Sequence, residues 1–366
     1  MKKRILSLIC MFLLNFSSFG AIILVNAGDD LQAKMNAAAV GDVLIVSAGT
    51  YGAAGITFNK RLTLIGTGYL FPANAPSTGV STISGTLNFL AAADGSVFTG
   101  FNITGSLIQI GSNNLTFSRN LVNSPTFYLG FNSAGYANTN NVVIKQCKFT
   151  TASSTVNIYG ATGSVAASNY QFLNNLFDSA NISLAHNSES SGVFINNSFS
   201  ANLTSNANIT TSSTSTFTNV SFYNNIFGKT LNTTGGYLLA SAAYIPTNFH
   251  FNVLVGNGVP EMNAPSATNL INQTANNIYA GWALNPQALT DDARNILKSA
   301  SPALIYGRLA PYLVGSTATD AGAYGGAEPY ITSGIPIGPY AYQLTVPNVA
   351  ANNSNIQITV KAKSNN

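Results

Sequence analysis

The sequence is poor in charge, in cysteine and in histidine, and each shortage excludes a class of protein. Only 7% of the 366 residues are charged, with 15 basic against 11 acidic side chains. Three of the basic residues are Lys2, Lys3 and Arg4, so the remainder of the chain is almost neutral. A chain without a basic patch is a poor candidate for binding nucleic acid. Two histidines in all argue against a histidine-rich metal centre.

The first residues have the pattern of an export signal. The segment MKKRILSLICMFLLNFSSFGA begins with basic residues, continues with an apolar run and ends in small side chains. We expect a signal peptide over residues 1–20, and hence an exported protein that is extracellular or on the outer cell surface, with the periplasm as a further location. The alternative is a membrane anchor, but the apolar run from Ile5 to Phe16 is shorter than the ~20 residues of a spanning helix.

Beyond that segment, Cys147 is the one remaining cysteine. An internal disulfide is therefore not expected, although disulfides are common in exported proteins. Stability must come from packing, and a domain of about 300 residues can bury a core large enough for that.

What the sequence does have is a repeat of aromatic residues and paired asparagines. The phrases QFLNNLF, VFINNSF and SFYNNIF each place an aromatic residue two positions before an amide pair. The repeat returns every 22 to 29 residues. Repeats of this length that are rich in aromatic and β-branched residues and lack a helical period predict stacked β-coils. A second short strand per coil is predicted from PTFYLG, STVNIYG, ANISLAH and GGYLLAS. The aligned aromatic or aliphatic positions are Phe117, Ile144, Phe172, Phe194 and Phe222, with Phe251 as the next member.

The second residue of each pair recurs at the predicted bend between two strands. Stacking would align these residues in a ladder, in which side-chain amides satisfy backbone groups of the neighbouring coil. We interpret the asparagines as structural, the alternative being a role in binding a ligand. Cys147 occupies one ladder position and is interpreted as a small buried residue, not as a nucleophile. The predicted ladder consists of Asn120, Cys147, Asn175, Asn197 and Asn225.

The N-terminal segment supplies a cap for such a stack. Asp29 or Asp30 predicts the start of a short helix that ends near Ala39, and VLIVSAGTY and RLTLIGTG predict strands. This order, with ILKSASPALIYG and ATDAGAYGGAEPY near the other end, resembles exported bacterial proteins with the pectin-lyase-like fold. The resemblance implies an all-β fold, a right-handed parallel β-helix with a short N-terminal capping helix. It does not imply an activity, because this fold hosts lyases, hydrolases, adhesins and non-catalytic surface proteins.

We expect four parts in the chain: a signal peptide (1–20), an N-terminal cap with the first coils (21–84), β-helix coils with a closing coil (85–330), and a linker with a two-stranded tail (331–366). The tail contains the alternating segments YQLTVP and IQITVKAKS after a linker rich in proline and glycine. They predict a β-hairpin packed on the last coil. The alternative is a docking element for a surface protein partner, because an isolated hairpin is only marginally stable.

The sequence offers few residues for catalysis. The resemblance implies that lyases of this fold use a basic residue and often calcium, and that hydrolases use paired aspartates. Carboxylates in the coils do not recur at the repeat interval, and Asp291 and Asp292 suit a helix start or turn, so neither a metal nor another cofactor is expected. A metal-independent eliminase would need a Lys or Arg base and a Tyr or His acid. The catalytic candidates, relevant only to an enzyme, are Arg119, Lys145, Lys148 and His186.

Two readings of these candidates remain open. Tyr159 and His186 are 27 residues apart, which predicts that they are neighbours on the second strand. Alternatively, the basic residues are solvated charges on strand surfaces, and His186 belongs to a loop.

The nearly neutral composition, rich in amides and hydroxyls, favours binding over catalysis. We expect a secreted or cell-surface β-helix protein that contacts an extracellular polysaccharide or another surface through its coil faces. Tyr128, Tyr159 and Tyr237 are candidates for stacking on sugar rings. The alternatives are a polysaccharide lyase or glycoside hydrolase, and a structural or adhesive component that docks on a protein partner through the C-terminal tail.

Overall fold

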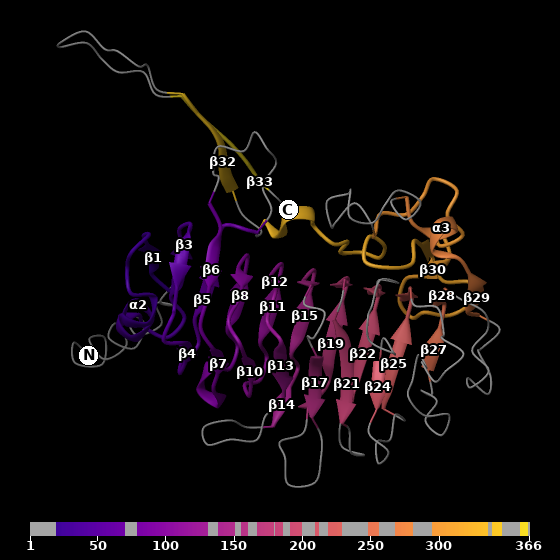
Figure 1. Ribbon diagram of the computed structural model, residues 1–366, viewed down its shortest axis with the longest axis horizontal. Helices are drawn as coiled ribbons and strands as arrows, with labels where there is room; N and C mark the ends of the chain where they lie inside the picture. Colours follow the sequence, from indigo (N-terminus) through magenta and orange to yellow (C-terminus); the bar gives the residue numbers. More distant parts are fainter. Residues whose placement is uncertain are drawn as a thin grey trace, which may run out of the picture.

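The protein is seen in a computed structural model, whose strands form three parallel sheets that wind together along one long axis (Figure 1). The structure describes residues 20–69, 79–130, 138–150, 155–159, 167–178, 180–185, 191–199, 209–211, 219–228, 248–255, 268–280, 295–335, 339–345 and 359–364. We name the sheets A, B and C. Successive strands of the chain pass from one sheet to the next, and the central coils pair with their neighbours in all three, whereas sheet C, within these residues, does not extend to the coils of β27, β28 and β29. The predicted class, an all-β parallel β-helix, is confirmed.

Sheet A consists of β1 (Ile22–Val25), β2 (Val43–Val46), β5 (Thr63–Ile65), β8 (Val97–Thr99), β11 (Thr116–Ser118), β15 (Val143–Lys145), β19 (Tyr170–Leu173), β22 (Gly192–Ile195), β25 (Val220–Tyr223) and β27 (Asn248–His250). Sheet B consists of β3 (Gly49–Tyr51), β6 (Ser81–Ile83), β9 (Asn102–Ile103), β12 (Leu121–Val122), β16 (Lys148–Phe149), β20 (Leu176–Phe177), β23 (Ser198–Phe199), β26 (Ile226–Phe227), β28 (Val253–Val255) and β29 (Leu270–Gln273). Sheet C consists of β4 (Ile56–Phe58), β7 (Leu87–Phe89), β10 (Ile108–Ile110), β13 (Thr126–Leu129), β17 (Thr155–Tyr159), β21 (Asn181–Ala185) and β24 (Ile209–Thr211).

The remaining elements are short. Two helices are α2 (Leu31–Ala37) and α3 (Ala275–Ile278), and two 3-10 turns are Ala91–Ala93 and Thr332–Gly334. One further parallel pair is β14 (Thr139–Asn140) with β18 (Ala167–Ser168). Two antiparallel pairs are β30 (Gly307–Arg308) with β31 (Ala318–Thr319), and β32 (Pro339–Thr345) with β33 (Thr359–Ser364).

The core consists of columns of aromatic rings that run along the long axis. In sheet A, the ring of Phe194 stacks on Phe172 at 4.9 Å and on Phe222 at 4.8 Å between centroids. In sheet B, Phe177 stacks on Phe149 at 4.8 Å and on Phe199 at 4.6 Å. These separations match the spacing of about 4.8 Å between paired strands, so strand pairing and ring stacking impose the same period.

The N-terminal end is closed as predicted. The carboxylate of Asp30 caps α2 by accepting a hydrogen bond from the Ala33 amide at 3.0 Å, and the helix buries Leu31 and Met35 over the end of the core. Covering the first coil in this way protects apolar side chains that no preceding coil could cover.

Two predictions about positions were wrong. Phe222 pairs with Phe249, not with Phe251, which lies two residues further on at the bend. The C-terminal tail is the predicted hairpin, β32 with β33, but it does not lie on the last coil. Figure 1 shows it near β6, at the level of the N-terminal coils, because the chain runs back along the long axis before the hairpin begins.

Candidate functional site

Buried asparagines form the predicted ladder at the bend between sheets A and B. The amide of Asn197 donates to the Phe172 carbonyl at 2.8 Å and to Asn225 Oδ1 at 2.9 Å, while its own Oδ1 accepts from the Asn175 backbone amide at 3.0 Å. The same pattern continues beyond the predicted members to Asn252 and Asn269. The ladder therefore satisfies buried backbone groups where no strand partner is available.

Cys147 interrupts the ladder. Its backbone amide donates to Asn175 Oδ1 at 2.9 Å, but its thiol lies where the neighbouring coils carry a side-chain amide, 3.6 Å from the Phe117 carbonyl. Burial raises the pKa of the Cys147 thiol to about 12, against backbone and side-chain hydrogen bonds that lower it. The interpretation of Cys147 as a buried packing residue fits this environment.

The first prediction concerns this thiol. When the other cysteine of the chain, Cys10 in the N-terminal segment, is replaced by serine, Cys147 should react with iodoacetamide at pH 8 far more slowly in the native state than in urea. A pKa raised from 9.0 to about 12 reduces the thiolate about a thousandfold, and burial restricts access as well. The raised pKa also lowers the free energy of unfolding as pH rises from about 9 towards about 12. In this range the thiol ionises in the unfolded chain but stays protonated in the folded protein. Mass spectrometry of alkylated Cys147 measures the rate, and equal native and unfolded rates would contradict the buried position.

The second prediction is that Cys147→Asn completes the ladder and stabilises the protein by about 1–2 kcal/mol. By analogy with Asn175, whose amide donates to Ile144 at 2.9 Å, the new amide would donate to the Phe117 carbonyl and accept from Asn120. A rise in the thermal unfolding midpoint tests this. Cys147→Ala serves as the control and should not raise the midpoint; a lower midpoint for Cys147→Asn would show that the site cannot hold the larger group.

A second row of side chains lies at the same bend, one residue before the ladder. These residues have left-handed backbone conformations, with φ between 53° and 57°, a region in which asparagine is enriched. Their side chains point away from the core. The row consists of Arg119, Gln146, Asn174, Asn196 and Asn224. Sequence reasoning overlooked the amide members of this row. Asn174, Asn196 and Asn224 are the first residues of the amide pairs, and Gln146 directly precedes the ladder residue Cys147.

This row binds the C-terminal part of the chain, residues 303–335, which we call the strap. The strap runs back over the ends of the strands from the last coils towards the first (Figure 1). Asn224 donates to Arg308 O at 2.8 Å. Further along, Asn174 donates to Gly325 O at 2.7 Å. The other contacts are Asn196 with Asp320 O and Gly322 O, Gln146 with Glu328 O and Pro329 O, and Arg119 with Ile335 O.

Apolar contacts hold the strap on the outer face of sheet B. Near the last coils, Ile226 and Val253 are buried with Ala303 and Ala321. Further towards the first coils, Leu176 of the central strand β20 belongs to a buried cluster with Ala323, Tyr330 and Tyr69, and the hydroxyls of Tyr69 and Tyr330 are hydrogen-bonded. The strap therefore covers a surface that the strand pattern alone would leave exposed.

The predicted catalytic residues lie around this strap and not in one open row. Arg119 is 4% exposed and Lys148 is 3% exposed, so neither is the solvated surface charge considered as the alternative. Lys145 lies on sheet A and forms an ion pair with Glu328 at 2.6 Å, whereas Lys148 lies on sheet B in register with Leu121 and Leu176. His186 lies outside the described residues, and Ala185, not His186, pairs with Tyr159.

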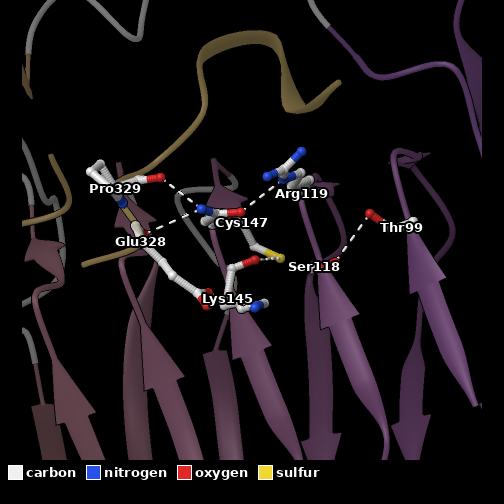
Figure 2. A network of polar contacts seen from close by, with 8 residues as sticks. Thr99, Ser118, Arg119, Lys145, Cys147, Glu328 and Pro329 are labelled. Carbon is white, nitrogen blue, oxygen red and sulfur yellow. Dashed lines mark hydrogen bonds and ion pairs between the residues drawn. The ribbon is translucent and has the colours of Figure 1, made fainter. Parts of the chain in front are cut away.

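Figure 2 shows the centre of this network. The Nε atom of Arg119 donates to Gln146 Oε1 at 2.8 Å, and Gln146 in turn donates to Pro329 O at 2.7 Å. Burial lowers the pKa of the Arg119 guanidinium, and the charge of Glu328 opposes that shift. Two hydrogen bonds of the Arg119 side chain connect the turn to the strap, to Gln146 and to Ile335, a position that does not suit a general base.

The outer face of sheet C carries a different row, mostly of amides and hydroxyls. Tyr128 is partly exposed between the buried Phe127 and Leu129, and it is in register with Gln109 and Asn157. The side chain of Tyr159 and the whole of Tyr237 lie outside what the structure describes. The row consists of Thr57, Asn88, Gln109, Tyr128, Asn157 and Ser183.

Metal ligands and membrane segments were also sought in the described ranges. They contain no group of three or more His, Cys, Asp or Glu side chains placed to bind a metal ion. Neither helix in this part of the chain has the length and hydropathy to cross a bilayer.

Comparison with known proteins gives no family for the chain. None of the known protein families matches the sequence, and none of the curated proteins is significantly similar to it. The function has to be argued from the residues and surfaces described above.

Proposed function

We propose that the chain is an exported β-helix protein that binds an extended polysaccharide on the outer face of sheet C, without cleaving it. The observation that carries the proposal is the register of Tyr128 with Gln109 and Asn157 on that face. Parallel strands repeat every ~4.8 Å, so a polymer lying across them would meet the partly exposed side chains of Tyr128 and Asn157 in adjacent coils, with the nearly buried Gln109 (9% exposed) in the coil before them. An aromatic ring among amides and hydroxyls offers both stacking and hydrogen bonds to sugars.

The lyase or hydrolase alternative has less support from the described residues. Arg119 and Lys148 are buried, and Lys145 is paired with Glu328. An eliminase needs a base that reaches the substrate proton. The finer assignment to the pectin-lyase-like fold is likewise an inference, supported by the capping helix and the strands that follow it in the predicted order. Docking through the C-terminal hairpin remains an alternative to be tested by deleting residues 339–366.

The third prediction tests the binding face. Tyr128→Ala should weaken binding of the protein to its polysaccharide by about tenfold, the size expected when a central aromatic contact is truncated. Affinity electrophoresis against neutral and acidic polysaccharides gives the retention, and reducing-end and unsaturated-product assays on the same samples detect cleavage.

Asn157→Ala and Asn248→Ala form a matched pair for this experiment. Asn157 faces outward on sheet C, whereas Asn248 faces outward on sheet A and donates to Ser221 Oγ at 3.1 Å. Retention should fall for Asn157→Ala alone. Unchanged retention for both Tyr128→Ala and Asn157→Ala would remove sheet C as the binding surface, and new chain ends would establish an enzyme.

A further inference from the structure

The carboxylate of Asp42 is buried at the N-terminal end of the stack without a cation beside it. Asp42 is only 6% exposed. Its Oδ1 accepts a hydrogen bond from the Ala21 backbone amide at 2.7 Å, and its Oδ2 accepts one from the Ala39 backbone amide at 2.8 Å. Within the described residues, no basic nitrogen lies at ion-pair distance from this carboxylate. A buried charge is costly unless it is paired, so this position favours a cation.

The two basic residues of the neighbouring coil do not supply that cation. Lys60 Nζ donates to the carbonyls of Asn36 and Ala38, each at 2.9 Å, at the end of α2. Arg61 is exposed, and its guanidinium lies beside Gly41, beyond ion-pair distance of the Asp42 carboxylate. The nitrogen of Ala21, which already lies against Oδ1, becomes a cation only if the chain begins there.

Ala21 is held in place by contacts that do not involve the residues before it. Its carbonyl accepts a hydrogen bond from the Val43 amide at 2.8 Å, and the parallel pairing of β1 with β2 begins at Ile22. Because these contacts remain when the preceding residue is removed, the Ala21 nitrogen keeps its position at Asp42.

Gly20 lies at the predicted end of the signal peptide and meets two requirements there. Ser18 and Gly20 are small residues three positions and one position before Ala21, the pattern at which signal peptidases cut. In the folded chain, a Cβ atom at residue 20 would lie 2.0 Å from the Gly41 carbonyl oxygen, so only glycine fits. The chain can therefore place Ala21 at Asp42 both before and after the Gly20–Ala21 bond is cut.

Hydrolysis of that bond creates the missing cation. One water supplies the hydroxyl group of the new Gly20 carboxyl and a proton to the Ala21 nitrogen. The carboxyl group leaves with the signal peptide as a carboxylate, and the amine takes up a second proton at neutral pH. A neutral N–H donor at Asp42 is thereby replaced by an ammonium group, which forms a stronger, charge-assisted hydrogen bond.

We propose that a signal peptidase cuts between Gly20 and Ala21, and that Asp42 binds the new α-ammonium group of Ala21. Since the second oxygen of Asp42 holds the Ala39 amide, this ion pair connects the start of β1 to the turn after α2 and completes the N-terminal cap. The inference rests on the export that is part of the proposed function. It adds a binding site for the chain's own new terminus, which polysaccharide binding does not require.

Acylation of the terminal amine tests the ion pair. The mature chain, residues 21–366, is released from a fusion protein by a protease that leaves no extra residue, and a second chain begins at Ser18. The ammonium form of an amine does not react with acetic anhydride. At pH 7 the mature chain should therefore react about tenfold more slowly at its terminus than the longer chain, which keeps a neutral N–H at Ala21. Mass spectrometry of the N-terminal peptide gives each rate, divided by the rate of the same chain in urea.

Asp42→Asn removes the charge and keeps the shape of the side chain. It should raise the rate of the mature chain to that of the longer chain, whose own rate should not change. Asp30→Asn is the matched control, because it removes an equal charge from the same end of the molecule and asparagine caps a helix as well as aspartate does. Equal rates for the mature chain with and without Asp42→Asn, or an equal increase from Asp30→Asn, would overturn the proposal.

Thermal unfolding gives a readout that does not depend on access of a reagent. Asp42→Asn should lower the midpoint of the mature chain by about 2 °C more than that of the chain from Ser18, because only the mature chain loses an ion pair. Equal decreases would show that Asp42 serves the backbone amides alone, against the proposal. N-terminal sequencing of the exported protein should begin at Ala21, and any other start would contradict the site of cleavage. These measurements do not involve sheet C, so a failure of polysaccharide binding in the Tyr128→Ala experiment would leave them standing.

Discussion

Replacement of Asn197 by alanine is expected to destabilise the protein by at least about 3 kcal/mol, because it leaves two or more buried backbone groups without partners. The Phe172 carbonyl loses its 2.8 Å bond and the Asn175 amide loses its 3.0 Å bond to the ladder. Asn197 is fully buried, so water cannot take over these bonds without entering the core. The drop in thermal midpoint and in urea midpoint measures the effect.

Asn248→Ala is the matched control for this change. Asn248 belongs to the same sheet region and also bonds a side chain, Ser221 Oγ at 3.1 Å, but it is partly exposed. Its replacement should alter stability by no more than about 0.5 kcal/mol, as for other surface positions. Similar losses of stability in the two variants would show that the buried ladder amide stabilises the protein no more than an exposed one.

Replacement of Phe194 by alanine is expected to destabilise the protein by about 3–5 kcal/mol. The ring lies in the middle of the sheet A column, stacked on Phe172 and Phe222, and Tyr170 packs against it edge-on at 6.0 Å. Its loss removes buried apolar area and two ring contacts at once. Since each coil is stabilised by its neighbours, the cavity weakens both halves of the stack.

Phe194→Leu separates the two contributions. Leucine keeps much of the buried area but cannot stack, so it should cost about 1–2 kcal/mol, well below the alanine variant. Chemical unfolding followed by far-ultraviolet circular dichroism distinguishes these values. A loss below about 1 kcal/mol for Phe194→Ala would show that the coils relax to fill the gap.

The parts of the fold that repeat could be predicted from the sequence. Ladder positions such as Asn175 and Asn197 follow from the recurring amide pair, and the α2 cap at Asp30 follows from a capping residue before an apolar helix face. The prediction failed at Phe251 because this aromatic residue lies in the turn, with φ of 58° and its ring beneath Arg308, while Phe249 two residues earlier takes the core position. Alternation by two residues leaves such a choice open, and strand register decides it.

The strap could not be predicted in the same way. It is bound through backbone carbonyls, for example those of Arg308 and Gly325, which leave no pattern in the sequence. The type of the residue also misled the assignment of Arg119. An arginine in the coils suggested a catalytic base, but Arg119 lies in a left-handed turn and its side chain donates to the Ile335 carbonyl of the strap. The amide row would have been found by asking why the first asparagine of each pair recurs.

The strap also affects the unfolding and the folding of the protein. A simple stack of coils can fray from either end, because each coil depends only on its neighbours. Here Tyr330 reaches back to Tyr69, so a single segment links coils that are far apart in the sequence. The coils between Tyr69 and Val253 that the strap contacts cannot separate without losing this link, so this part of the stack unfolds more cooperatively than coils without a strap. During synthesis the coils must be complete before the strap can close over them, which makes closure a late and slow step of folding.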